Sequence, residues 1–125
     1  DIISFHVPLD LETKNLITIK EIKLMKKDVL LVNTARGGII NEGDLSVALQ
    51  DKLIAGAAID VYEDEPYSGE LVKYDNCILT AHMGSMSIDC RTRMEREATE
   101  DTVLFLLGGK LKRPVPNYEY ENQTK

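Results

Sequence analysis

Three short apolar runs, each followed by polar or charged residues, restrict this chain to a narrow choice of folds. The runs occupy residues 29–32, 54–61 and 77–80. Short aliphatic runs bounded by turn-forming residues are typical of strands that are buried in a parallel sheet. Segments with helix signals separate the runs. Alternating strands and helices predict an α/β fold with a doubly wound parallel sheet.

Two helices are predicted between these strands. Thr18 and Glu21 have the spacing of a capping box, which begins a helix that should end near Asp28. Asn41 is suited to cap the next helix, because its side-chain oxygen can accept from the free amides of the first turn. The inward face of that second helix would carry Leu45, Ala48 and Leu49.

A long helix is predicted after the last apolar run. Ser85 or Ser87 can begin it, and it should extend over about residues 88–107. Gly108 supplies a stop, because glycine readily adopts the left-handed conformation that ends helices. From Pro114 onward, with Tyr118 and Tyr120, we expect an extended tail.

Composition excludes several classes of protein. A chain of 125 residues with 43% hydrophobic content can bury one core. The net charge is −6 and no basic run exceeds Lys26-Lys27, which argues against nucleic-acid or anionic membrane partners. Cys77 and Cys90 lack the spacing of a metal site or a redox pair, so we expect a reducing, cytoplasmic compartment.

Charged side chains follow the predicted strands at the points where the strands end. Arg36 follows the first run and His82 follows the third. Asp60 lies at the end of the second run, and Glu65 follows that run. The carboxyl ends of parallel strands meet at one edge of a sheet, which is where open α/β sheets bind ligands. Arginine can bind a carboxylate with two hydrogen bonds, and histidine can transfer a proton near neutral pH. The pattern therefore predicts an enzyme active site.

The segments around these residues resemble the D-isomer-specific 2-hydroxyacid dehydrogenases. The resemblance is carried by four motifs, which occur in the family's order. They are His6-Val7-Pro8-Leu9, Val32-Asn33-Thr34-Ala35-Arg36-Gly37, Gly56-Ala57-Ala58-Ile59-Asp60-Val61-Tyr62-Glu63-Asp64-Glu65-Pro66 and Leu79-Thr80-Ala81-His82-Met83-Gly84-Ser85. The resemblance runs from His6 through nearly the whole chain, and it implies a Rossmann-type fold and NAD as the cofactor.

The resemblance also implies roles for individual residues. Arg36 would bind the carboxyl and carbonyl oxygens of a 2-oxo acid, His82 would be the acid/base, and Glu65 would be the partner of His82. Asp60 would contact the nicotinamide carboxamide, and Glu63 would be exposed. The remaining cofactor contacts, besides Arg36, Asp60 and His82 themselves, would be His6, Val7, Pro8, Thr34, Ala35 and Gly84. No metal is expected. Hard metal ions need several converging oxygen ligands, and the sequence offers none besides the carboxylates of residues 60–65.

The glycine turn of dinucleotide-binding folds is missing from this chain. The turn has the pattern Gly-x-Gly-x-x-Gly, and no Gly-x-Gly occurs here. We therefore expect the C-terminal half of a dinucleotide-binding domain in residues 1–109, a tail in residues 110–125, and little activity or NADH affinity in the chain alone. Two departures from the family pattern are Ala81, where proline is common, and Lys52, where glycine often ends the helix.

Three other functions are compatible with parts of this pattern. Formate dehydrogenases carry glutamine in place of the glutamate, so Glu65 argues against them. Transcriptional corepressors of the same superfamily retain arginine, glutamate and histidine, so a non-catalytic NAD-sensing protein stays open, as does a half-domain that acts only in assembly. The sequence leaves open which 2-hydroxy acid would be the substrate. The resemblance favours a homodimer.

Overall fold

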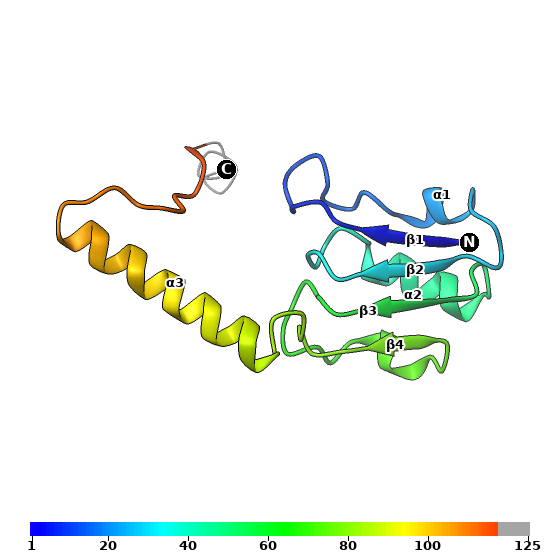
Figure 1. Ribbon diagram of the computed structural model, residues 1–125. Coiled ribbons are helices and arrows are strands. Elements are labelled where there is room, and N and C mark those ends of the chain that lie inside the picture. The colour runs from blue at the N-terminus through cyan, green and yellow to red at the C-terminus, as the bar shows by residue number, and fades with distance from the viewer. Residues whose placement is uncertain (118–125) are drawn as a thin grey trace. The chain divides into compact units, whose positions relative to one another are not determined.

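The computed structural model describes residues 1–117, in which two compact units are divided along the chain between residues 83 and 84. The first unit contains a parallel sheet of four strands in the order β1-β2-β3-β4 (Figure 1). The strands are β1 (Ile2–Phe5), β2 (Leu30–Asn33), β3 (Gly56–Ile59) and β4 (Cys77–Leu79). The predicted fold class is confirmed by this parallel sheet and its flanking helices.

One face of the sheet carries the hydrophobic core. Alternate residues of the strands point to this face, where Phe5, Leu31 and Ile59 are buried. The helix α2 (Glu42–Gln50) lies behind the sheet in Figure 1 and contributes the buried residues Leu45 and Ala48 to the same core. The inward face predicted for this helix is therefore confirmed.

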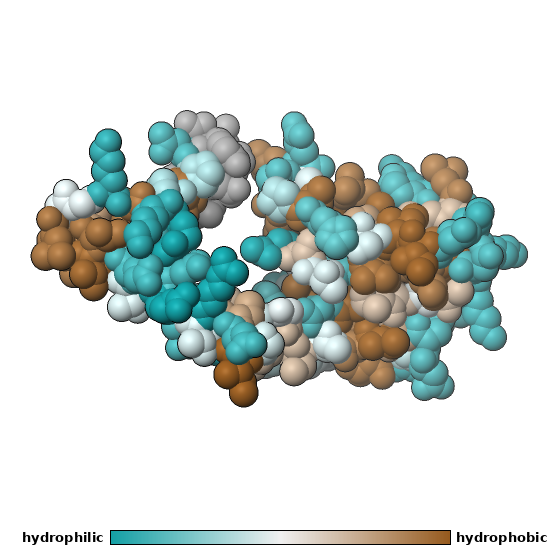
Figure 2. All heavy atoms as spheres, viewed as in Figure 1, coloured by the Kyte–Doolittle hydropathy of each residue, from teal (hydrophilic) through white to brown (hydrophobic). Residues whose placement is uncertain are grey.

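The opposite face of the sheet is largely open within residues 1–83. Leu30 is 42% exposed and Ile78 is 69% exposed, and the surface in front of the strands is apolar in Figure 2. The sequence predicted a buried strand at residues 29–32, whereas Leu30 on this strand is exposed within the unit. The two helices and the 3-10 helix η1 (Glu70–Lys73) leave this face uncovered.

The first helix is shorter than the sequence predicted. The capping box at Thr18 is confirmed, because its side chain and that of Glu21 both bond the opposing backbone amides. However, α1 (Ile19–Ile22) ends well before Asp28. The amides of Leu24 and Met25 bond carbonyls three residues back, which tightens the chain into turns.

The end of α2 contains the left-handed residue that the sequence placed in doubt. Lys52 has φ of 53°. Its amide bonds the carbonyl of Leu49 at 3.3 Å, and the amide of Leu53 bonds the carbonyl of Ala48 at 2.9 Å. These two bonds form a Schellman motif, in which a glycine is usual at the position of Lys52.

Replacing Lys52 with glycine should therefore stabilise the protein. The left-handed backbone costs a residue with a Cβ about 1 kcal/mol, and glycine does not bear this cost. We expect Lys52→Gly to raise the free energy of unfolding by up to about 1 kcal/mol in a denaturant titration. Lys20→Gly, inside α1, is the control and should destabilise. An equal loss in both variants would contradict the assigned cap.

The second unit is built on the helix α3 (Ile88–Leu106). Ser87 caps it by accepting from the amide of Cys90 at 3.2 Å, so Ser87 rather than Ser85 begins the helix. Gly108 has φ of 76° and ends it, as predicted. None of its residues is buried. No helix within residues 1–117 is long and apolar enough to cross a membrane.

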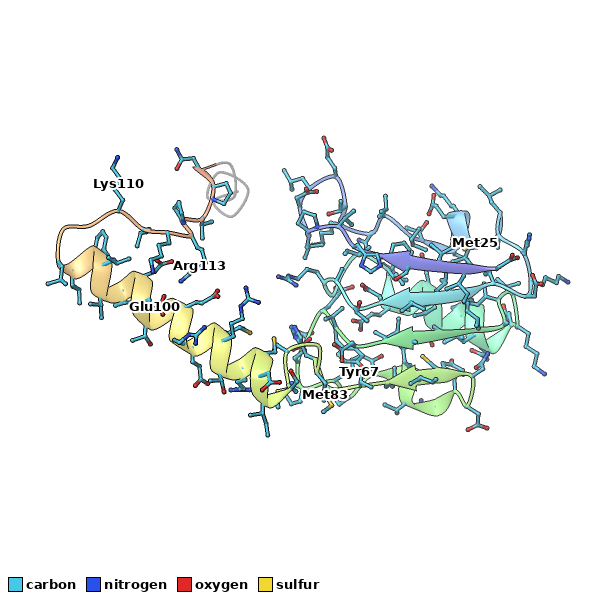
Figure 3. All side chains as sticks on the ribbon, in the orientation of Figure 1. Met25, Tyr67, Met83, Glu100, Lys110 and Arg113 are labelled. Atoms are coloured by element: carbon cyan, nitrogen blue, oxygen red, sulfur yellow. The ribbon has the colours of Figure 1, made fainter. Side chains whose placement is uncertain are left out.

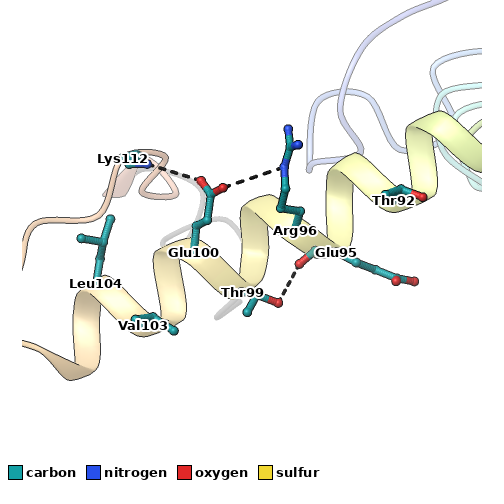
Figure 4. A pocket seen from close by; sticks show the side chains of 8 residues that line it. All are labelled: Thr92, Glu95, Arg96, Thr99, Glu100, Val103, Leu104 and Lys112. Carbon is teal, nitrogen blue, oxygen red and sulfur yellow. Dashed lines mark hydrogen bonds and ion pairs between the residues drawn. The ribbon is translucent and has the colours of Figure 1, made fainter.

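Basic residues after α3 fold back onto its acidic side. Arg113 contacts the carboxylates of Glu97 and Asp101 at 3.5 Å each, and Lys112 contacts Glu100 at 3.3 Å (Figures 3 and 4). The hollow in Figure 4 lies beside this contact. The extended tail predicted from Pro114 includes Tyr118 and Tyr120, which lie outside the described residues.

Candidate active site

The predicted catalytic residues lie beyond the carboxyl ends of neighbouring strands. Arg36 follows β2, Glu65 follows β3 and His82 follows β4. These three strands are parallel, and their register pairs Asn33 with Ile59 and Ile59 with Leu79. All three residues are therefore carried at the same edge of the sheet, as the sequence predicted.

The structure brings His82 and Glu65 into direct contact. The Nδ1 atom of His82 lies 2.9 Å from Oε2 and 3.2 Å from Oε1 of Glu65. Both side chains are partly exposed, so a small molecule can reach them. The hydrogen bond with His82, and secondly one from the Tyr62 amide, hold the pKa of the Glu65 carboxyl below its usual value. Nδ1 is thus occupied, and Nε2 is the nitrogen left for a reacting molecule.

The lowered pKa of Glu65 predicts how the stability of this pair depends on pH. A carboxyl whose pKa is depressed on folding stabilises the protein above its unfolded pKa, and this stability is lost as pH falls through the folded pKa. The stability gap between the wild type and Glu65→Gln should therefore narrow as pH falls from neutral to below the ordinary value of 4.5. Denaturant unfolding at several pH values measures this gap.

Glu63→Gln is the matched control for that titration, because Glu63 is an exposed glutamate in the same loop. Its stability relative to the wild type should not follow the same course. A gap for Glu65→Gln that stays constant or widens toward acid pH would contradict the lowered pKa of the Glu65 carboxyl.

Asp60 is buried and bonds the loop that carries His82. Its Oδ1 accepts from the amide of Met83 at 2.8 Å and from the hydroxyl of Thr80. Its backbone carbonyl accepts from the amide of His82 at 2.8 Å. His82 itself has φ of 51°, so these bonds hold a backbone conformation that is rare for residues other than glycine. The contact of Asp60 with nicotinamide stays a prediction.

Asn33 shapes the turn before Arg36, and the sequence analysis assigned it no role. It is 2% exposed, its Nδ2 donates to the carbonyl of Arg36 at 2.9 Å, and its Oδ1 accepts from the amide of Ala35 at 3.1 Å. A polar residue at the end of an otherwise apolar strand was the available signal. The turn leaves the Arg36 side chain exposed, with Nη1 donating to the carbonyl of Ala35 at 2.6 Å.

Gly37 joins the loops after β2 and β3. A Cβ at this position would overlap the backbone carbonyl of Tyr62, so only glycine allows the two loops to lie this close. The loop that carries Arg36 is thereby fixed against the loop that carries Glu65.

The other predicted cofactor contacts are more dispersed. His6 is exposed, with Nε2 lying 2.8 Å from the hydroxyl of Ser4. Val7, Pro8 and Thr34 are also exposed, whereas Ala35 is half-buried against the core. Gly84 begins the second unit. The structure therefore places His6, Val7 and Pro8 after β1, and Thr34 and Ala35 after β2.

Two stacked tyrosines lie beside Glu65, and the sequence analysis did not single them out. The rings of Tyr62 and Tyr67 are stacked with centroids 4.3 Å apart. They line a cavity of about 520 Å³ together with Glu65. Figure 3 shows Tyr67 and Met83 near the carboxyl end of β4.

Comparison with known proteins identifies the family. Residues 1–84 match the model of the NAD-binding domain of D-isomer specific 2-hydroxyacid dehydrogenases. The chain belongs to this family, as its motifs predicted.

Individual relatives agree with this assignment. A glyoxylate reductase of Thermococcus litoralis is 42% identical over 109 residues, which cover 86% of this chain and 33% of that protein. The chain is also similar to an NADPH-dependent glyoxylate/hydroxypyruvate reductase of Sinorhizobium meliloti, which was solved with NADP and malonate. The TM-score is 0.88 at 29% identity, and the match covers 92% of this chain and 36% of the reductase. The NAD-complexed 2-hydroxyacid dehydrogenase of Lactobacillus delbrueckii gives 0.78 at 30% identity, with coverage of 93% and 40%. The chain thus spans about a third of the length of such relatives.

Proposed function

We propose that this chain supplies the catalytic edge of an NAD-dependent D-2-hydroxyacid dehydrogenase that reduces glyoxylate or a similar small 2-oxo acid. The observation that carries the proposal is the contact between Glu65 and Nδ1 of His82. This contact lies at the same edge of the sheet as the exposed Arg36. The substrate class is favoured by the glyoxylate reductases among the relatives.

The residues at this edge fit the nicotinamide half of the cofactor. Thr34 is exposed and Ala35 is small, so both permit close approach, and Asp60 is a carboxylate buried beside the loop of His82. We propose that His6, Val7, Pro8 and Gly84 complete the cofactor contacts. When bound, NAD supplies or accepts the hydride. The chain has no glycine turn for the pyrophosphate, so these residues hold only part of the cofactor.

The remaining chemistry belongs to side chains of this chain. The Arg36 guanidinium makes no salt bridge within residues 1–117, so it can bind the substrate carboxylate with two parallel hydrogen bonds. His82 donates a proton from Nε2 to the C2 oxygen during reduction and accepts it during oxidation. The Glu65 carboxylate contacts Nδ1 of His82 and fixes the direction of the ring.

The organisation of the whole protein is part of the same proposal. We propose that residues 1–109 form the C-terminal half of the NAD-binding domain, including α3 as an interdomain helix, and that residues 110–125 form a tail. The family resemblance favours a homodimer with the cofactor domains at the interface, and the spacing of the two cysteines favours the cytoplasm.

A hybrid enzyme tests the function directly. The segment of the Thermococcus litoralis glyoxylate reductase that aligns with this chain is replaced by the chain itself, giving what we call the hybrid reductase. We expect it to oxidise NADH in the presence of glyoxylate. A folded hybrid that binds NADH and reduces none of glyoxylate, hydroxypyruvate or pyruvate would contradict catalysis and would support the NAD-sensing interpretation.

A smaller exchange guards against a hybrid that does not fold. Exchanging only residues 56–85 transfers Glu65 and His82 together with the strands that position them. Loss of activity in a folded version of this enzyme would likewise count against the proposal.

A further inference from the structure

Tyr62 makes hydrogen bonds to both loops of the site. Its hydroxyl shares its one proton between the carbonyl oxygen of Thr80, 2.8 Å away, and that of Ile59, 2.9 Å away. Its backbone amide donates to Oε1 of Glu65 at 3.1 Å. Tyr62 is 8% exposed, so its hydroxyl is largely withdrawn from water.

We propose that Tyr62 is a positioning residue, whose hydroxyl joins the ends of β3 and β4 and thereby sets the geometry between Glu65 and His82. This inference deepens the proposed function and rests on it for its catalytic consequence. Its geometric part concerns this chain alone.

The bond to Thr80 is the one that matters for His82. The carbonyl of Ile59 also accepts from the amide of Thr80 at 3.0 Å, so it keeps a partner without the tyrosine. The Thr80 carbonyl lies two residues before His82, whose left-handed backbone must be held by its surroundings. Without the hydroxyl, this carbonyl loses a buried donor and the segment before His82 is free to shift.

The Tyr62 hydroxyl can donate its hydrogen bond at any pH below its own pKa. Burial raises the pKa of Tyr62 to about 12, so the hydroxyl keeps its proton and stays a donor. Stacking on Tyr67 fixes the plane of the ring. A phenylalanine at this position would keep the stacking and lose only the link between the two strands.

The test compares Tyr62→Phe with Tyr67→Phe in the whole chain. Each variant removes one hydroxyl from the stacked pair, but the Tyr67 hydroxyl accepts from the amide of Leu71 and does not bond Thr80. The readout is the titration of the Glu65 carboxyl, followed by carbon-13 NMR. Since the contact with His82 is the main cause of the lowered pKa of Glu65, Tyr62→Phe should raise that pKa toward its ordinary value. Tyr67→Phe should leave it unchanged.

Two results would overturn the proposal. One is a Glu65 titration that Tyr62→Phe leaves unchanged, and the other is an equal shift in both variants. Core amide signals report whether each variant is folded. Should Tyr62→Phe unfold, the hydroxyl proton of Tyr62 in the unmodified chain still decides, because we expect it to be protected from exchange and rapid exchange would contradict the bond.

The hybrid reductase tests the catalytic consequence. We expect Tyr62→Phe to lower kcat about 10-fold while the KM for glyoxylate and the affinity for NADH change less than about 2-fold, because only the alignment of the proton donor is disturbed. An inactive parent hybrid would count against the proposed function and leave the NMR result standing. A kcat that Tyr62→Phe does not alter in an active hybrid would overturn the positioning role alone.

Discussion

Replacing His82 with alanine in the hybrid reductase should lower kcat for glyoxylate by about 100-fold to 10,000-fold, the range over which a positioned proton donor accelerates a reaction. The Glu65 carboxylate bonds Nδ1 of His82 and leaves Nε2 to transfer the proton. Within residues 1–117, no other side chain forms a hydrogen bond with this imidazole. The affinity for NADH should change far less, because proton transfer takes place at the substrate oxygen. Steady-state kinetics and a separate NADH titration measure the two quantities.

His6→Ala is the informative comparison, because His6 is the only other histidine of the chain. We propose a cofactor contact for it, so its replacement should weaken NADH binding more than it slows the chemical step. Equal losses of kcat and NADH affinity for His82→Ala would refute its role in proton transfer.

The second large effect is expected at Gly37. A Cβ at this position would overlap the carbonyl of Tyr62, which is backbone and cannot move as the end of a side chain can. The loops after β2 and β3 must separate to admit it. We therefore expect Gly37→Ala to lower the free energy of unfolding by about 3 kcal/mol, near the upper end for an overpacked site. Denaturant unfolding of the chain measures this loss.

Gly43→Ala provides the control. Gly43 lies in the first turn of α2, where an added Cβ would make only an ordinary contact with the side chain of Asn41. Alanine favours helix there, so this variant should gain up to about 0.5 kcal/mol. Losses of similar size at Gly37 and Gly43 would show that the close approach of the two loops is not what requires glycine.

The sheet and the longer helices could be predicted from the sequence because their signals are local. The apolar runs, the caps at Asn41 and Ser87, and the stop at Gly108 each act within a few residues. The early end of α1 was missed, because the chain after it tightens into turns where Ile22 is buried in the core, which is a tertiary effect. The exposure of Leu30 was missed because an apolar run does not reveal which of its two faces will be covered.

The positions of the proposed catalytic residues could be predicted as well as the sheet and the longer helices. Parallel strands carry whatever follows them to one edge, so the placement of Arg36, Glu65 and His82 followed from chain order and spacing. The supporting residues did not follow from spacing. The Asn33 side chain donates to the backbone carbonyl of Arg36, and the Tyr62 hydroxyl donates to that of Thr80. A sequence does not show which carbonyl a side chain will reach.

The proposed role of Glu65 is to hold the imidazole of His82 so that Nε2 faces the reacting oxygen. Nitrogen-15 NMR of the imidazole at a pH where the ring is neutral tests it most directly, because the spectrum distinguishes which nitrogen carries the proton. The contact of Nδ1 with the Glu65 carboxylate predicts the tautomer with its proton on Nδ1, and Glu65→Gln should weaken that preference. A neutral ring with its proton on Nε2 in the unmodified chain would contradict the account.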